Sequence, residues 1–149
     1  MKPRLNPALP QAIRSWLTAW TNCRRAAKCK CPANPKLAKD GKTIYVVPVG
    51  ERTIFDGKEG TKIFKITDGT SNTVMVVDVM PENAVIWSKP DDWSFLVKDP
   101  GAGLLEGKRE QFLAAYADGS VRALPTNIDR GDLRRLMQKD DGEVLSKQY

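Results

Sequence analysis

Oxygen-bearing side chains in turn-forming stretches are the first candidates for chemistry in this sequence. Asp68, Asn72 and Asp118 carry hard oxygen ligands, the type that calcium prefers. An EF-hand loop would need acids at alternating positions and a later glutamate, and that pattern is not present. Asp and Asn side chains also hydrogen-bond neighbouring backbone in ordinary turns. We therefore predict turn residues here, and no required metal.

Asp91 and Asp92 are the candidate pair for acid–base chemistry. Because they are adjacent, their carboxylates would tend to diverge, and capping of a helix that starts near Pro90 explains them more simply. Ser71 as a nucleophile would need a general base, and the sequence contains no histidine. A lysine base is possible, but no pattern marks one. We predict that the protein is not an enzyme.

Three cysteines, Cys23, Cys29 and Cys31, suggest a zinc site. A structural zinc site normally has four ligands, and the sequence offers neither a fourth cysteine nor a histidine. Unpaired thiols, or one disulfide with one thiol left over, both fit better. The sequence therefore predicts no cofactor, and the cysteines leave the cellular compartment open.

Charge divides the 149 residues into two parts. Residues 1–42 hold ten Lys/Arg and one acid, a formal charge of +9, whereas residues 43–149 hold fourteen Lys/Arg and seventeen acids, a charge of −3. We predict a basic N-terminal segment followed by one α+β globular domain over 43–149. The mild acidity of that domain argues against nucleic-acid binding by it. No apolar run approaches the roughly 20 residues that span a bilayer, and we expect neither a signal peptide nor a membrane anchor.

The N-terminal segment has the pattern of an amphipathic helix from Asn6-Pro7 to about Lys30. An apolar stripe at helical spacing would pack on the sheet, and its members are Ile13, Trp16, Leu17 and Trp20. Three alternatives stay open, namely disorder, an artefactual start of the reading frame, and an arm that binds a membrane surface or nucleic acid.

The stretch from Lys65 to Asp78 organises the rest of the chain. Gly69 permits left-handed backbone conformations, and Asp68, Ser71 and Asn72 favour a tight polar turn. Thr73 to Val77 then reads as a central strand covered on both faces. Asp118-Gly119-Ser120 separates two β-rich runs, which predicts a hairpin with a two-residue type I′ loop.

The remaining elements follow from the same local signals. Asn127 or Asp129 should cap a last helix whose apolar stripe contains Leu133, Leu136 and Met137, with Asp140-Asp141-Gly142 as its stop. Residues 99–107 should form a mobile loop, and further strands are expected at 43–49, 53–55, 62–66, 84–87, 111–117 and 121–124. The predicted fold class is α+β, an antiparallel sheet packed with one or two helices, including a short C-terminal helix.

From Cys31 to about Glu143, the chain resembles a planctomycete family of unknown function, the DUF fifteen-fifty-nine family. Five blocks carry the resemblance: Cys31-Pro32, 43–50, 66–73, the block 87–92 with Trp87, Pro90, Asp91 and Asp92, and the block 116–122 with Asp118, Gly119 and Ser120; the final helix and Gly142-Glu143 follow them. Lys108 stands where the family often has a histidine, and the prepilin leader is not seen.

The resemblance implies a pseudopilin-like domain, extracytoplasmic or envelope-associated, with protein partners in a secretion or cell-surface assembly. We accordingly predict a non-enzymatic structural or interaction module. The alternative is a binding module whose basic N-terminal segment docks on an anionic surface, whether membrane, nucleic acid or acidic polymer.

Overall fold

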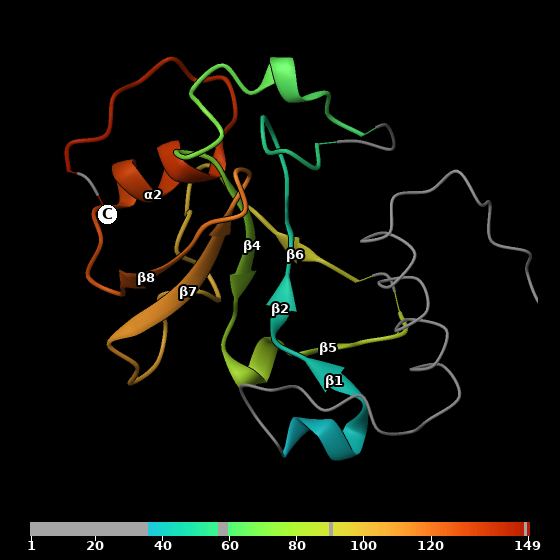
Figure 1. The fold of residues 1–149 in the computed structure, drawn as a ribbon. Helices are drawn as coiled ribbons and strands as arrows, with labels where there is room; N and C mark the ends of the chain where they lie inside the picture. The colour runs from blue at the N-terminus through green and yellow to red at the C-terminus, as the bar shows by residue number, and fades with distance from the viewer. Residues whose placement is uncertain (1–35, 57–59, 90, 148) are drawn as a thin grey trace, which may run out of the picture.

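The computed structural model describes residues 36–56, 60–89, 91–147 and 149 (Figure 1). The expected N-terminal helix, the three cysteines and Pro90 lie outside these residues. The described elements, in chain order, are η1 (Leu37–Asp40), β1 (Lys42–Thr43), β2 (Tyr45–Val46), β3 (Pro48–Val49), η2 (Ile63–Lys65), β4 (Val74–Asp78), η3 (Pro81–Asn83), β5 (Val85–Ile86), β6 (Trp93–Ser94), β7 (Gln111–Tyr116), β8 (Val121–Pro125) and α2 (Arg130–Met137).

A four-stranded antiparallel sheet in the order β2-β4-β7-β8 forms the centre of the fold. β4 lies between two partners, which confirms the central strand expected from its run of β-branched residues. Val74 and Val77 are almost fully buried, and the register with β7 shifts between Val74 and Val76. This irregularity turns both buried valines toward the same core despite their odd spacing.

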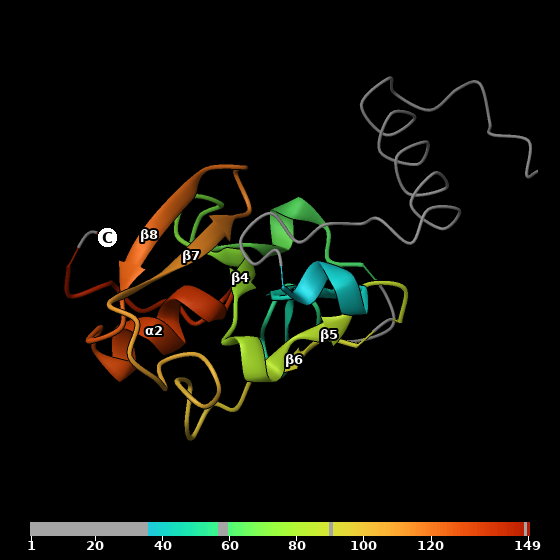
Figure 2. The same ribbon diagram turned by 90° about the horizontal axis from the view of Figure 1, so that it is seen from below.

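Helix α2 covers one face of the sheet, as seen from below in Figure 2. Its apolar stripe of Leu133, Leu136 and Met137 is at most 1% exposed, as the sequence predicted. Asp129 caps the helix by accepting hydrogen bonds from the backbone N–H groups of Gly131 and Asp132. The helix ends at Met137, before the predicted stop at 140–142.

Two small ladders lie on the side of the sheet away from α2 in both ribbon views. β1 pairs with β5 antiparallel, and β3 pairs with β6 parallel. The prediction of a single strand over 43–49 is therefore wrong, because this stretch is divided among three sheets. The Thr43 hydroxyl accepts a hydrogen bond from the Tyr45 N–H (3.1 Å), which bends the chain at Ile44.

Three further predictions of local structure are wrong. Residues 53–55 form turns, with the Thr53 hydroxyl bonded to the Gly50 carbonyl (3.0 Å), and 62–66 contain the 3-10 turn η2. No helix starts at residues 91–93, because the Trp93 N–H donates to the Val47 carbonyl (3.1 Å) and places Trp93 in strand β6. In each case a contact distant in sequence overrides the local signal.

The stretch 99–107 is a loop, as expected, but part of it is held by the core. Leu104 is fully buried, and the Arg109 guanidinium donates to its carbonyl (2.9 Å). The fold class is α+β with a main antiparallel sheet and a short helix near the C-terminus, as predicted. Among the described helices, none has the length and apolar character needed to cross a bilayer.

Candidate functional site

The turn before β4 is a compact structure built from its own polar side chains. Gly69 has a φ of +95°, the left-handed region that glycine tolerates best. Its carbonyl accepts hydrogen bonds from the Asn72 N–H (3.0 Å) and from the Thr73 hydroxyl (3.1 Å). The Asn72 amide donates to the Asp68 carbonyl (3.1 Å), and Ser71 is exposed. Asn72 therefore helps to close this turn.

The Asp68 carboxylate fastens the segment that follows α2. It accepts hydrogen bonds from the backbone N–H groups of Asp141 (2.7 Å) and Gly142 (3.0 Å). The Asp68 N–H in turn donates to the Lys139 carbonyl (3.3 Å). Hydrogen bonds to an ionised acceptor are stronger than neutral ones. Asp68 thus holds residues 139–142 against the turn.

The same turn also holds the tip of the β7–β8 hairpin. The Thr73 carbonyl accepts from the Ala117 N–H (2.9 Å), and the Thr70 carbonyl accepts from the Asp118 N–H (3.1 Å). The β7–β8 register confirms the hairpin, and its Asp118-Gly119 turn lies beside the Asp68-Gly69 turn that precedes β4.

The predicted type I′ geometry of this hairpin is wrong. Only Gly119 (φ +86°) has a positive φ, and the Gly119 N–H donates to the Tyr116 carbonyl (2.9 Å). The Tyr116 N–H donates to the Ser120 carbonyl (2.9 Å), so the loop is a type I turn followed by a left-handed residue. The Asp118 carboxylate accepts from the Ser120 N–H (2.8 Å), which favours this form.

Asp132 is the most heavily bonded carboxylate of this region, and its side chain is completely buried. It accepts hydrogen bonds from the Arg135 guanidinium (2.9 Å), the Tyr149 hydroxyl (2.8 Å) and both the N–H (3.0 Å) and hydroxyl of Ser146. Burial opposes its ionisation, but these donors outweigh burial and lower the pKa of Asp132 to about 2. Burial and the bond to Asp132 raise the pKa of Tyr149 to about 12.

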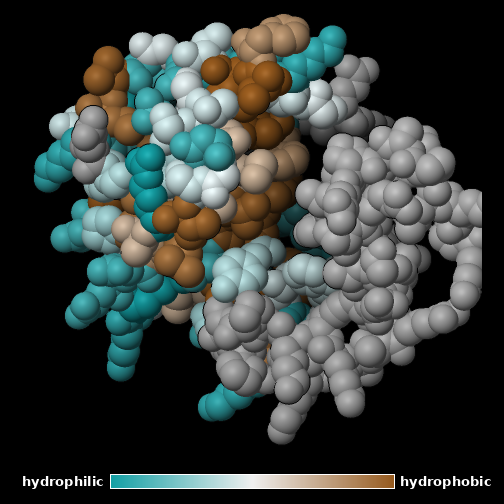
Figure 3. All heavy atoms as spheres, in the orientation of Figure 1, coloured by the Kyte–Doolittle hydropathy of each residue, from teal (hydrophilic) through white to brown (hydrophobic). Residues whose placement is uncertain are grey.

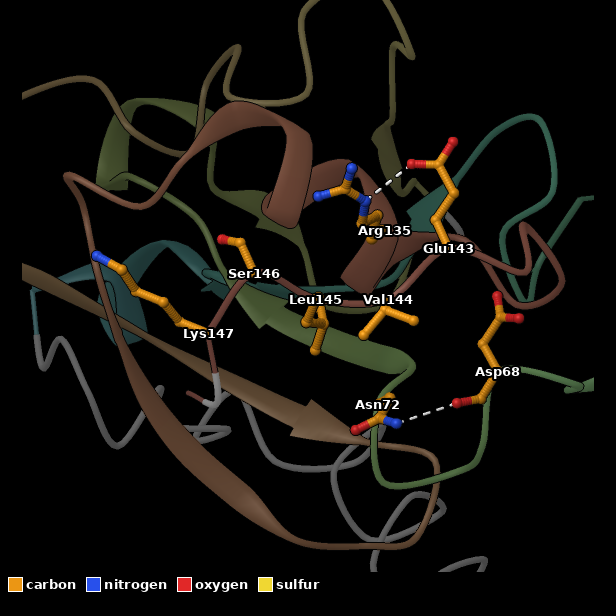
Figure 4. A pocket seen from close by; sticks show the side chains of 8 residues that line it. All are labelled: Asp68, Asn72, Arg135, Glu143, Val144, Leu145, Ser146 and Lys147. Carbon is orange, nitrogen blue, oxygen red and sulfur yellow. Dashed lines mark hydrogen bonds and ion pairs between the residues drawn. The ribbon is translucent and has the colours of Figure 1, made fainter.

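A pocket of about 390 Å³ lies between the Asp68 turn, α2 and the C-terminal segment (Figure 4). Glu143 of this pocket is paired within the protein, because it bonds to Arg135 (2.8 Å) and to Arg134 (3.2 Å). The pocket is lined by Asp68, Asn72, Arg135 and Glu143, and by the consecutive residues Val144, Leu145, Ser146 and Lys147. The arrangement holds the chain segments together, and the one hydroxyl of the lining that bonds to a carboxylate, that of Ser146, donates to Asp132.

The second predicted group, around Trp87, lies near the small ladders. Trp87 is 45% exposed, and its backbone N–H donates to the Gly41 carbonyl (2.9 Å). Asp91 forms an ion pair with Lys89 (2.6 Å). Partial burial, and then the charge of Asp91, raise the pKa of Asp92. Among the described residues, no hydrogen bond or ion pair joins this group to the Asp68 turn.

Sequence reasoning did not find Asp132, Ser146 or Tyr149 as members of a network. A signal for Asp132 was present, because it lies on the apolar stripe of the last helix, one turn before Leu136. An acid in that position is buried and requires partners. The identities of those partners depend on how the chain folds back after α2. Among the described residues, no group of three or more acids, cysteines or histidines is arranged to hold a metal ion.

The fold and site define a small α+β domain whose polar residues connect its own segments. No family model, no curated protein and no solved structure matches this chain.

Proposed function

We propose that this domain is a non-enzymatic assembly module that associates with further copies of itself through the outer face of the β7–β8 hairpin. The observation that carries the proposal is the apolar character of that face. Leu113 is 41% exposed and Val121 is 63% exposed, although both lie in regular strands of the main sheet.

The two faces of the hairpin differ in what covers them. On one face, Phe112, Ala114 and Tyr116 belong to the same buried core as the apolar stripe of α2 and are at most 1% exposed. The alternate residues point away from α2, and their cross-strand pairs are Leu113 with Ala123 and Ala115 with Val121. A sheet face that is exposed to water usually carries polar residues at these positions. An apolar outer face is therefore suited to contact with another protein.

The position of β8 supports the same function. β8 is the terminal strand of the main sheet in the described part of the chain, and its only strand partner there is β7. An edge strand offers backbone donors and acceptors to an incoming strand. A second copy that approaches the hairpin would meet this edge and the apolar face together.

The acids of the site support the non-enzymatic part of the proposal. Asp68 is bonded to backbone N–H groups, Asp129 caps α2, and Asp132 accepts four hydrogen bonds. Groups that bind so many internal donors are poor general bases, because their charged form is already stabilised. The resemblance to the DUF fifteen-fifty-nine family agrees with an assembly role and suggests an envelope-associated setting.

Light scattering across a range of protein concentrations tests the proposal. We expect the mass of the wild-type chain to rise with concentration, and the variant Leu113→Lys/Val121→Lys to remain monomeric, because lysines block both the face and the edge. The matched control is Leu96→Lys/Val144→Lys, at two apolar residues that are 55% and 86% exposed elsewhere. A wild-type chain that stays monomeric, or a hairpin variant that assembles normally, would contradict the proposal.

A further inference from the structure

The most exposed aromatic residue of the described chain lies on η2, outside both the site and the hairpin. Phe64 is 72% exposed and its neighbour Ile63 is 70% exposed. Figure 1 shows η2, in green, at the upper edge of the fold, and brown and tan spheres occupy that edge in Figure 3. No residue of η2 is buried, so the turn projects its apolar side chains into solvent.

The charges beside this apolar pair have one sign. Lys62 and Lys65 flank it and are both exposed, and the stretch 60–67 contains no acid. The Lys62 ammonium lies 5.8 Å from the centre of the Phe64 ring. A nearby acid, Asp56, forms an ion pair with the buried Lys139. The tip therefore combines two exposed apolar side chains with two exposed cations.

We propose that Lys62-Ile63-Phe64-Lys65, here called the η2 tip, binds the surface of an anionic lipid bilayer. Ile63 and Phe64 enter the boundary between headgroups and acyl chains, while the two lysines remain among the anionic headgroups. Interfacial binding scales with buried apolar area plus attraction to anionic lipid, and the tip supplies both.

The size of the tip favours a bilayer over a protein partner. A stable protein interface buries about 800 Å² on each partner, with a well-packed apolar centre. Two side chains on a short 3-10 turn fall well below that area. A bilayer has no fixed shape to match, so a small projecting tip can insert without a complementary pocket.

Vesicle sedimentation with the full chain tests this proposal. Vesicles of phosphatidylcholine with phosphatidylglycerol are compared with vesicles of phosphatidylcholine alone. We expect Ile63→Ser/Phe64→Ser to lower the partition coefficient on anionic vesicles by at least about tenfold. Lys62→Gln/Lys65→Gln should lower it by about tenfold on anionic vesicles and change little on neutral ones.

The control is Leu96→Ser/Val144→Ser, which removes two exposed apolar residues elsewhere and should leave partitioning within about twofold of wild type. This control also separates the tip from attraction by the basic segment 1–42, which every variant retains. Unchanged melting temperatures establish that the variants fold. The proposal is overturned if the serine variant at the tip partitions like wild type, or if the control and tip variants show the same fall in partition coefficient. It is also overturned if the tip mediates lipid-free dimers that the serine variant abolishes.

Discussion

Asp132 is the buried carboxylate whose ionisation we expect to limit the stability of this domain in acid. The perturbation is Asp132→Asn, which keeps the shape of the side chain and removes its charge. Asp132 accepts hydrogen bonds from Arg135, Ser146 and Tyr149. The amide nitrogen of Asn is a donor and cannot accept the hydrogen bonds that one carboxylate oxygen accepts. The variant therefore loses part of these hydrogen bonds at neutral pH.

The size of the effect follows from the lowered pKa. A fall from 3.8 to about 2 corresponds to at most about 2.4 kcal/mol of stability. Ser146 is exposed and Tyr149 half-buried, so solvent screening reduces the expected contribution to about 1–2 kcal/mol. Because the folded-state pKa is the lower one, this stability is present above the unfolded pKa of 3.8 and is lost as the pH falls through about 2.

Urea unfolding of the wild type and the variant, from about pH 6 to about pH 2, measures this contribution. The wild type should have the higher free energy of unfolding at pH 6, and the difference between wild type and variant should narrow by about 1–2 kcal/mol in acid. Asp99→Asn is the control, since the Asp99 carboxylate forms an exposed ion pair with Arg130. The difference in unfolding free energy between this control and the wild type should change little with pH. A gap for Asp132→Asn that does not change with pH would refute the reasoning.

Three other predictions concern the turns, the domain start and metals. Gly119→Val should lower the free energy of unfolding in denaturant by on the order of 1–2 kcal/mol, because φ is +86° there. Asp118→Asn should leave that free energy nearly unchanged; a tolerated Gly119→Val with a damaging Asp118→Asn would indicate a functional carboxylate. Residues 36–149 should unfold cooperatively. A chain that starts at residue 43 lacks Leu37, which packs on the core, so its free energy of unfolding should be about 1–2 kcal/mol lower; equal free energies for the two chains would contradict this. EDTA and added calcium or zinc should leave the melting temperature unchanged, and a rise with either ion would contradict the turn interpretation.

Elements with strong local signals could be predicted from the sequence. The β-branched run after Gly69 forms β4, the Asp-Gly hairpin forms between β7 and β8, and Asp129 caps α2. In these places a turn or cap residue lies next to a run with one clear period, so local and tertiary preferences agree.

The failures occur where a contact distant in sequence decides the structure. Lys62–Ile66 has the composition of a strand, but no described strand pairs with it, and Ile63 and Phe64 stay in solvent. Asp91 and Asp92 resemble a helix start, yet Trp93 pairs with β3. The network around Asp132 depends on residues 14 and 17 positions away, a separation that no local pattern encodes.

The link between residues 52–56 and 139–140 has a consequence for synthesis of the protein. The buried Lys139 ammonium donates to the Thr53 carbonyl (2.9 Å), and Arg52 binds Asp140 (2.9 Å), across separations of 86 and 88 residues. On a ribosome, the Thr53 carbonyl must therefore stay hydrated until the chain after α2 has emerged. The 50–56 turns can reach their final packing only at that late stage, although β1 to β4 are synthesised long before it.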